Sequence, residues 1–336
     1  METKFKVGIG AGIILLIAAI SAWYYFNISA KTPERALRIV EESIHEHNKE
    51  NFYKYVDVEG ILANSYDGII EGMTYSNKEM TADAKESVKD FTEMLRAPLL
   101  LSLQASIDSY VETGDFHDED NLGVSELLKR TGLNKSEFRG VGNIKVNPND
   151  DDIAEADIQI YHPEIGREFT LKFILNRDES GEWKIVRVEN FYDFIRQINQ
   201  TRRKKLDDYL KDSAEINFRH DKTIREAEKK YSDTLAAGSL SQESTRKKLQ
   251  AIMTDEVKKD WEKRKSDLLS LTVPKDAETL QNLRLKICDL EIAYSEGYAQ
   301  WMDDKQASTV KAADEKHRQA QTLKSEEIIL SRRMAE

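Results

Sequence analysis

The sequence predicts an α+β protein with an N-terminal transmembrane helix. A domain of helices packed on a four-stranded antiparallel meander should follow, and then an antiparallel α-helical bundle or coiled-coil hairpin. Three observations lead to this prediction: an uncharged apolar run over residues 7–26, apolar residues that alternate with a period of two between residues 138 and 188, and apolar residues at spacings of three and four after residue 202. The composition agrees, because 33% of residues are charged and only 5 are prolines.

The first apolar run is long enough to cross a membrane. As a helix, residues 7–26 would span roughly 30 Å, the thickness of the hydrocarbon core of a bilayer. The run ends in four aromatic residues, 23–26, which suit the headgroup interface. Lys4 and Lys6 lie on the short flank, so the positive-inside rule places residues 1–6 in the cytoplasm as a stub.

We therefore expect a single-pass signal anchor in the cytoplasmic (inner) membrane, with the C-terminal domains periplasmic or extracellular. A cleaved signal peptide is the alternative, with Ile20-Ser21-Ala22 as its cleavage site. The apolar run is longer than a typical h-region, and cleavage there would leave an aromatic cluster at the new N-terminus. Both features favour the uncleaved anchor.

Charge and cysteine content restrict the partners and the covalent structure. The net charge of -11 argues against a nucleic-acid partner. Cys288 is the only cysteine, so no disulfide can form within the chain. Its position on an apolar helix face indicates a buried thiol, and a bridge between two chains is the alternative.

The α+β domain should occupy residues 33–198. Thr32 as a cap, Pro33 at the first helical position and Glu34 behind it form a strong helix start. Pro98 marks a kink or a restart within one of the later helices. Beyond the first helical region, which ends near residue 56, helices are predicted over residues 58–72, 77–111 and 122–133.

The period of the apolar pattern changes from 3.6 to 2 after residue 138. Four alternating runs follow, separated by short turn clusters that contain proline, glycine, asparagine or aspartate. The runs are Val141 to Val146, Ala156 to Ile160, Phe169 to Leu175 and Trp183 to Val188. Short turns between consecutive strands predict an antiparallel meander, and its apolar face should be covered by the preceding helices.

A helical bundle is predicted over residues 202–302. Its helices should break at Ala237-Gly238 and at Thr272-Val273-Pro274, and Ser239 with Gln242 has the pattern of a capping box. The connections are short, so neighbouring helices should be antiparallel. Residues 303–336 are charged and weakly apolar, and we expect a helical or frayed tail there.

Four short motifs give the chain a resemblance to known proteins. They are Thr32-Pro33-Glu34-Arg35-Ala36-Leu37, Tyr55-Val56-Asp57, Leu95-Arg96-Ala97-Pro98-Leu99-Leu100 and Trp183-Lys184-Ile185-Val186-Arg187-Val188. Together with the preceding apolar helix, they resemble bacterial membrane-anchored families of unknown function. The domain of these families is similar to the nuclear-transport-factor-2-like (cystatin-like) cone. The resemblance covers about residues 33–198 and implies a curved sheet wrapped around helices, but no catalytic residues.

Two groups of residues suggest metal binding. His45 and His47 lie two apart, so on a helix they point about 200° away from each other and cannot share a metal. The acidic runs at residues 115–120 and 149–152 lack the spacing of a calcium-binding loop. Solvated surface is the favoured interpretation for all of them.

A further candidate is an acid/base pair made of Asp57 and either Tyr53 or Tyr55. Asp57 is equally well placed to cap the next helix. The chain has no P-loop, no nucleophile elbow and no zinc-protease motif. We therefore predict no catalytic, cofactor-binding or metal-ligating residue, no cofactor, and no enzymatic activity.

The expected function is protein–protein contact at the bacterial envelope. The bilayer should hold residues 7–26, and the bundle at 202–302 should bind a protein partner or a second copy. The stripe of Tyr294, Tyr298 and Trp301 is interpreted as bundle core, and the basic run 201–205 as a solvated linker helix rather than a lipid or polyanion site. The alternative function is binding of a small hydrophobic ligand, or isomerase- or hydrolase-like activity, in the cone.

Overall fold

The computed structural model describes residues 31–74, 82–114 and 135–335. It is a mostly helical α+β structure with one four-stranded antiparallel sheet, as the sequence predicts. Two compact units divide the chain, one ending at Thr201 and the other beginning at Arg202. The long helix α7 (Phe191–Ala236) contributes residues to both units.

The N-terminal unit begins with helices. They are α2 (Pro33–His45), α3 (Lys49–Tyr55), α4 (Val58–Thr74) and α5 (Ala82–Thr113). Thr32 caps α2, because its side chain accepts a hydrogen bond from the amide of Arg35 at 3.3 Å and Pro33 takes the first helical position. The predicted start is confirmed. Pro98 lies inside α5, which continues through it without a restart.

The sheet is a simple meander. Its strands are β1 (Glu137–Asn147), β2 (Asp150–His162), β3 (Arg167–Arg177) and β4 (Trp183–Val188), and each pairs antiparallel with the next. The predicted order and pairing are therefore confirmed. The register places Ile158 opposite Leu171 and Ala156 opposite Phe173, so the apolar residues of neighbouring strands share one face.

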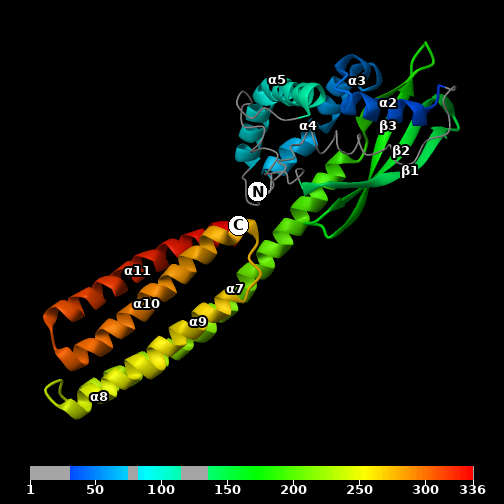
Figure 1. Ribbon diagram of the computed structural model, residues 1–336. Helices are drawn as coiled ribbons and strands as arrows, with labels where there is room; N and C mark the ends of the chain where they lie inside the picture. The colour runs from blue at the N-terminus through cyan, green and yellow to red at the C-terminus, as the bar shows by residue number, and fades with distance from the viewer. Residues whose placement is uncertain (1–30, 75–81, 115–134, 336) are drawn as a thin grey trace. The chain divides into compact units, whose positions relative to one another are not determined.

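That face forms the core of the unit together with the helices (Figure 1). Ile158, Phe173 and Ile185 are fully buried in one cluster with residues from α2 to α5. The start of α7 joins the same cluster through Phe191, Phe194, Ile195 and Ile198. Residues on the other face, such as Gln159 and Thr170, are exposed, which is the pattern of a sheet covered on one side.

The C-terminal unit is an all-helical bundle (Figure 1). After α7, the chain forms α8 (Glu243–Ala251), a π-helical segment (Ile252–Lys258), α9 (Lys259–Leu269), a 3-10 turn (Lys275–Ala277), α10 (Glu278–Asp304) and α11 (Ala307–Ala335). The predicted breaks near Gly238 and Pro274 coincide with the ends of α7 and α9. The predicted capping box is wrong, because α8 begins after Gln242, whose side chain makes no capping hydrogen bond.

Residues 303–336, predicted as a charged helical or frayed tail, contain α11, which packs along α10. Close approach of the two helices requires a small residue at Gly297, where an added Cβ would lie 3.0 Å from Cβ of Ala313. Ala313 and Ala320 are both buried. These small side chains let the last helix approach α10 closely, and the larger side chains of Leu323, Leu330 and Met334 pack against the apolar clusters of the bundle.

Some predicted elements lie outside the residues that the structure describes. Within the ranges that the structure describes, no helix is long and apolar enough to span a membrane. The expected anchor at residues 7–26 lies outside those ranges, as do the helix at 122–133 and the acidic run at 115–120.

The packing of the sheet predicts a clear difference between its two faces. Replacing buried Ile158 by alanine should lower the free energy of unfolding by about 2–5 kcal/mol, because it leaves a cavity between sheet and helices. The neighbouring change Gln159→Ala, on the exposed face, should cost less than about 0.5 kcal/mol. Amide hydrogen exchange of β2 and β3 measures both, and equal effects would contradict the assignment of the two faces.

Candidate functional site

The two histidines that suggested metal binding have separate surroundings. His45 is the last residue of α2, and Glu46 is its C-cap. His47 adopts a left-handed backbone conformation and places Nδ1 3.1 Å from the carbonyl oxygen of Val111. Over the described ranges no group of three histidine, cysteine, aspartate or glutamate residues could hold a metal ion.

The residues of the possible acid/base pair, Asp57 with Tyr53 or Tyr55, contact different partners. The carboxylate of Asp57 accepts a hydrogen bond from the amide of Gly60 at 3.0 Å and so caps α4, as its alternative interpretation predicts. The hydroxyl of Tyr53 donates to Asp108 on α5. The Tyr55 hydroxyl lies 3.4 Å from Glu182. Each side chain therefore ties one element to another.

Of the acidic run 149–152, only Asn149 lies in the turn between β1 and β2, and Asp150 to Asp152 begin β2, where Asp152 pairs with Arg177 at 2.7 Å. In the bundle, Tyr298 contacts both Tyr294 and Trp301, with ring centroids 5.4 and 5.2 Å away. Tyr294 and Tyr298 pack, half-buried, against the apolar core of the bundle. Burial raises the pKa of the Tyr294 hydroxyl.

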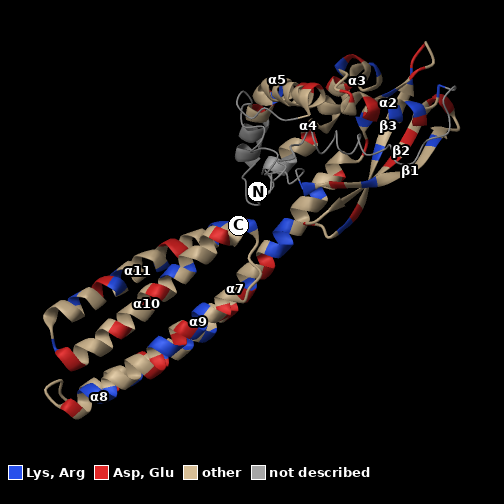
Figure 2. Cartoon of the chain, in the orientation of Figure 1, with Lys and Arg blue, Asp and Glu red and all other residues tan. Residues whose placement is uncertain are grey.

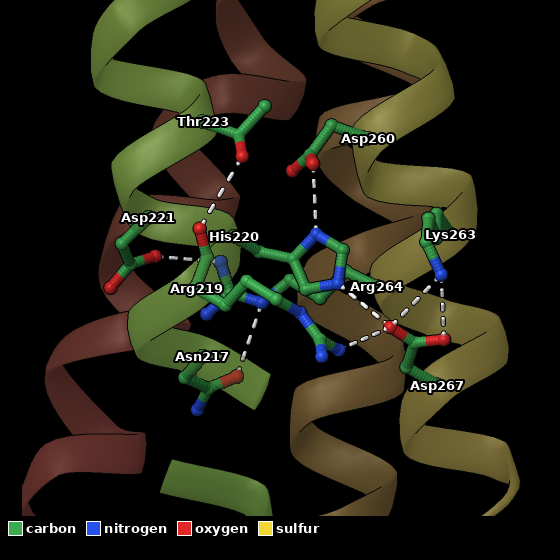
Figure 3. A network of polar contacts seen from close by, with 9 residues as sticks. All are labelled: Asn217, Arg219, His220, Asp221, Thr223, Asp260, Lys263, Arg264 and Asp267. Carbon is green, nitrogen blue, oxygen red and sulfur yellow. Dashed lines mark hydrogen bonds and ion pairs between the residues drawn. The ribbon is translucent and has the colours of Figure 1, made fainter. Parts of the chain in front are cut away.

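The strongest concentration of polar contacts lies between α7 and α9 and was not predicted from the sequence (Figure 3). His220 on α7 is only 2% exposed. Its Nδ1 lies 2.8 Å from Asp260 and its Nε2 lies 3.1 Å from Asp267, both on α9. One imidazole ring thus joins two carboxylates that are two helical turns apart.

The hydrogen bonds of this cluster determine the charge of the Asp267 carboxyl. Hydrogen bonding from His220, with help from Lys263 and Arg219, holds the pKa of the Asp267 carboxyl below its ordinary value. An ionised carboxylate only accepts hydrogen bonds, so Nε2 of the ring carries a proton. The second oxygen of Asp260 is buried and accepts no hydrogen bond from the described residues.

Two buried arginines extend the polar contacts across the bundle. Arg264 on α9 donates to Asn217 and Asp221 on α7, at 3.1 and 2.7 Å. Arg284 on α10 donates to Glu327 on α11 at 2.7 Å, and also to the hydroxyls of Tyr209 and Ser331. Each guanidinium is therefore satisfied by several partners, which a buried charge requires.

A third polar cluster joins α10 to α11. Glu291 is almost fully buried and accepts hydrogen bonds from His317 at 3.0 Å and from Lys324 at 2.6 Å. Burial alone would raise the pKa of this carboxyl, but these two partners outweigh it and the pKa is lowered. The same hydrogen bond raises the pKa of the His317 ring.

An open groove runs along the bundle between α7 and α11, with a volume of about 330 Å³. Its floor contains the buried side chains of Trp261, Leu268 and Ile287. Ile328 on α11 lines one side and is 58% exposed. On the other side, Phe218 of α7 is 72% exposed and lies seven residues before the groove residue Arg225, so both project in nearly the same direction.

The groove is better suited to contact than to chemistry. The acidic and basic groups on its floor, such as Arg264 and Arg284, already have partners, whereas the large apolar side chains on its two sides face solvent. Exposed apolar groups beside an apolar floor are typical of surfaces that bind other proteins. Comparisons with protein-family models, with curated proteins and with solved structures find no match to this chain.

Two features of the sequence can be compared with the structure of the bundle. Arg284 and Glu291 lie at heptad spacing among the apolar residues of α10, and Lys324 and Glu327 have the opposite charges on α11. This charge complementarity between the two segments is the signal in the sequence that could have indicated that α11 belongs to the bundle. The lone cysteine is buried as expected, and burial raises the pKa of the Cys288 thiol to about 11.

The α7–α9 cluster predicts a large effect of losing its central ring. His220→Ala would remove the imidazole ring that contacts both the Asp260 and the Asp267 carboxylate. We expect the bundle to lose about 3–5 kcal/mol of stability, the usual cost of removing one partner from a buried charged cluster. Chemical denaturation followed by helix content measures this, with Lys222→Ala on the exposed side of α7 as the control. A loss equal to that of the control would contradict the burial of the cluster.

The α10–α11 cluster predicts a pH window. Because the pKa of His317 is raised, its contribution is full below its ordinary pKa of 6.5 and is lost as pH rises through the folded-state pKa. Because the pKa of Glu291 is lowered, its contribution is full above 4.5 and is lost as pH falls through the folded-state pKa.

We therefore expect the stability difference between the wild type and His317→Gln to be largest between pH 4.5 and 6.5 and to shrink at higher pH. The exposed neighbouring change Lys316→Ala should show no such maximum. A difference that stays constant to high pH would show that His317 does not act through its charge.

Proposed function

We propose that this chain is a non-enzymatic, single-pass membrane-anchored protein of the bacterial envelope whose helical bundle binds a protein partner. The observation that carries the proposal is the groove between α7 and α11, which exposed Ile328 lines and beside which helical spacing places exposed Phe218. Aromatic and aliphatic anchors around an apolar groove are the features from which protein interfaces gain most of their affinity.

The partner that suits this groove is an amphipathic helix. The groove follows α7 from Asn217 to Glu228, which is about three helical turns. Its floor carries the apolar side chains of Trp261, Leu268 and Ile287, and charged residues of both signs, including Arg225 and Glu228, line it. A helix could place its apolar face on Trp261 and pair its flanking charges with those residues.

The membrane anchor rests on the sequence. Residues 7–26 are uncharged and apolar, and Lys4 and Lys6 precede them. An N-terminus in the cytoplasm and a large domain after the helix would place both described units outside the cytoplasmic membrane. We propose this location together with the contact function, because a tethered bundle would meet other envelope proteins at high local concentration.

For the N-terminal unit we propose the cone-like architecture of nuclear-transport-factor-2-like domains. The support is the four-stranded meander with helices on one face, together with the short motifs between Thr32 and Val188. We assign the unit no reaction. Asp57 caps a helix and Tyr53 bonds Asp108, so their contacts favour structural roles over acid/base catalysis.

Crosslinking in intact membranes tests the contact function. The double variant Phe218→Glu/Ile328→Glu changes two exposed side chains and should leave the fold intact, as judged by helix content. We expect it to reduce crosslinking of the partner at least about tenfold, because hot-spot residues of an interface each contribute more than 1.4 kcal/mol. The mass of the crosslinked species distinguishes a second copy from another protein.

The matched control is Leu235→Glu/Leu240→Glu, which introduces the same charges at exposed apolar residues of the bundle that do not line the groove. Its crosslinks should equal those of the wild type. If the groove variant kept its partners, or if both variants lost them equally, the groove would not be the contact surface.

A further inference from the structure

The end of α11 is fixed against the beginning of the bundle. The guanidinium of Arg203 on α7 donates hydrogen bonds to the carbonyl oxygens of Met334 and Ala335, at 2.9 and 2.7 Å. Leu206 packs in the same apolar cluster as Met334. Two segments that are far apart in the sequence therefore form one end of the bundle.

Both segments bring cations to that end. Four consecutive basic residues, 202–205, lie on α7, where Figure 2 shows them as an unbroken blue stretch. The last turn of α11 adds Arg332 and Arg333. The side chains of Lys204, Lys205, Arg332 and Arg333 are exposed. We call these four residues the basic end.

The basic end differs from most of the charged surface of the bundle. Elsewhere, exposed cations such as Lys230 and Lys259 form ion pairs with acidic residues of the bundle. Lys204, Arg332 and Arg333 form no ion pair with the residues that the structure describes. Positive charge is thus concentrated here in a chain whose net charge is -11.

Described acidic residues also lie close to the basic end. Asp207 is paired with Arg203 at 2.8 Å, and Asp208 is exposed on the next turn of α7. The C-terminal dipole of α11 favours cations such as Arg332 and Arg333. It does not account for Lys204, which lies in the interior of the 46-residue helix α7.

We propose that the basic end binds the anionic headgroups of a lipid bilayer. Its cations are exposed on two adjoining helices, an arrangement that suits phosphates spread over a surface. Clusters of four or more lysines and arginines bind anionic membranes in this way. This inference adds a second contact to the proposed protein-binding groove and uses different residues.

The test measures energy transfer between the full-length chain and lipid nanodiscs. A donor dye is attached at Ala335→Cys, beside the basic end, while Cys288 is buried and stays unlabelled. The acceptor is on the headgroups of discs made of phosphatidylcholine alone or with phosphatidylglycerol, added in excess. We expect transfer to rise with the anionic fraction and to fall when salt screens the charges.

Two variants with the same total charge change distinguish binding by the basic end from an effect of net charge alone. Lys204→Glu/Lys205→Glu/Arg332→Glu/Arg333→Glu should lower affinity for anionic discs at least about tenfold and return transfer to the level of neutral discs. Lys222→Glu/Lys229→Glu/Lys311→Glu/Lys316→Glu, at exposed positions elsewhere on the bundle, should keep the rise.

The proposal is overturned if transfer in the wild type does not depend on phosphatidylglycerol, if the basic-end variant keeps that dependence, or if the control variant loses it equally. Energy transfer reports how close residue 335 lies to the lipid headgroups, and excess discs allow this contact whether or not residues 7–26 insert. Insertion of residues 7–26 is measured separately, by co-elution of the chain with neutral discs. Failure of the anchor, of the groove and of the basic end would therefore be seen in three different measurements.

Discussion

The C-terminal unit depends on charged side chains that are buried in pairs between α10 and α11. Arg284 with Glu327 and Glu291 with Lys324 join these helices at two levels. Taking such groups out of water is costly, and the cost is offset only when hydrogen bonds satisfy each charge. Here every guanidinium and carboxylate of the two pairs has more than one partner.

These pairs have consequences beyond their own helices. They hold α11 on the bundle, and α11 in turn supplies one side of the groove and half of the basic end. Buried charges also favour one register, because a shift of a single turn would leave a charge without its partner. We infer that the main effect of these pairs is to fix the register in which α11 packs on α10, and that their contribution to the free energy of unfolding is smaller.

Much of the described fold could be predicted from periodicity. The alternation around Ile158 and Phe173 defined the strands, and short turns between them left the meander as the simplest arrangement. The cap at Thr32 and the breaks near Gly238 and Pro274 were equally readable, because proline and glycine act through the local backbone. Local signals of this kind do not depend on knowledge of tertiary contacts.

The remaining features depend on tertiary contacts and could not be found in this way. A charged, alanine-rich segment such as α11 resembles a frayed tail until its partners on α10 are known, since Ala313 and Ala320 bury little area. His220 has the same difficulty. Nothing around it in the sequence indicates burial, and its two acidic partners lie on a different helix, 40 and 47 residues away.

Amide hydrogen exchange of α11 tests the central claim most directly. If buried ion pairs close the bundle, the amides of residues 307–335 should be protected to a free energy close to that of α10, apart from fraying at the ends. Exchange throughout α11 at the rate of an unfolded chain, with α10 still protected, would contradict the account and would remove the groove and the basic end with it.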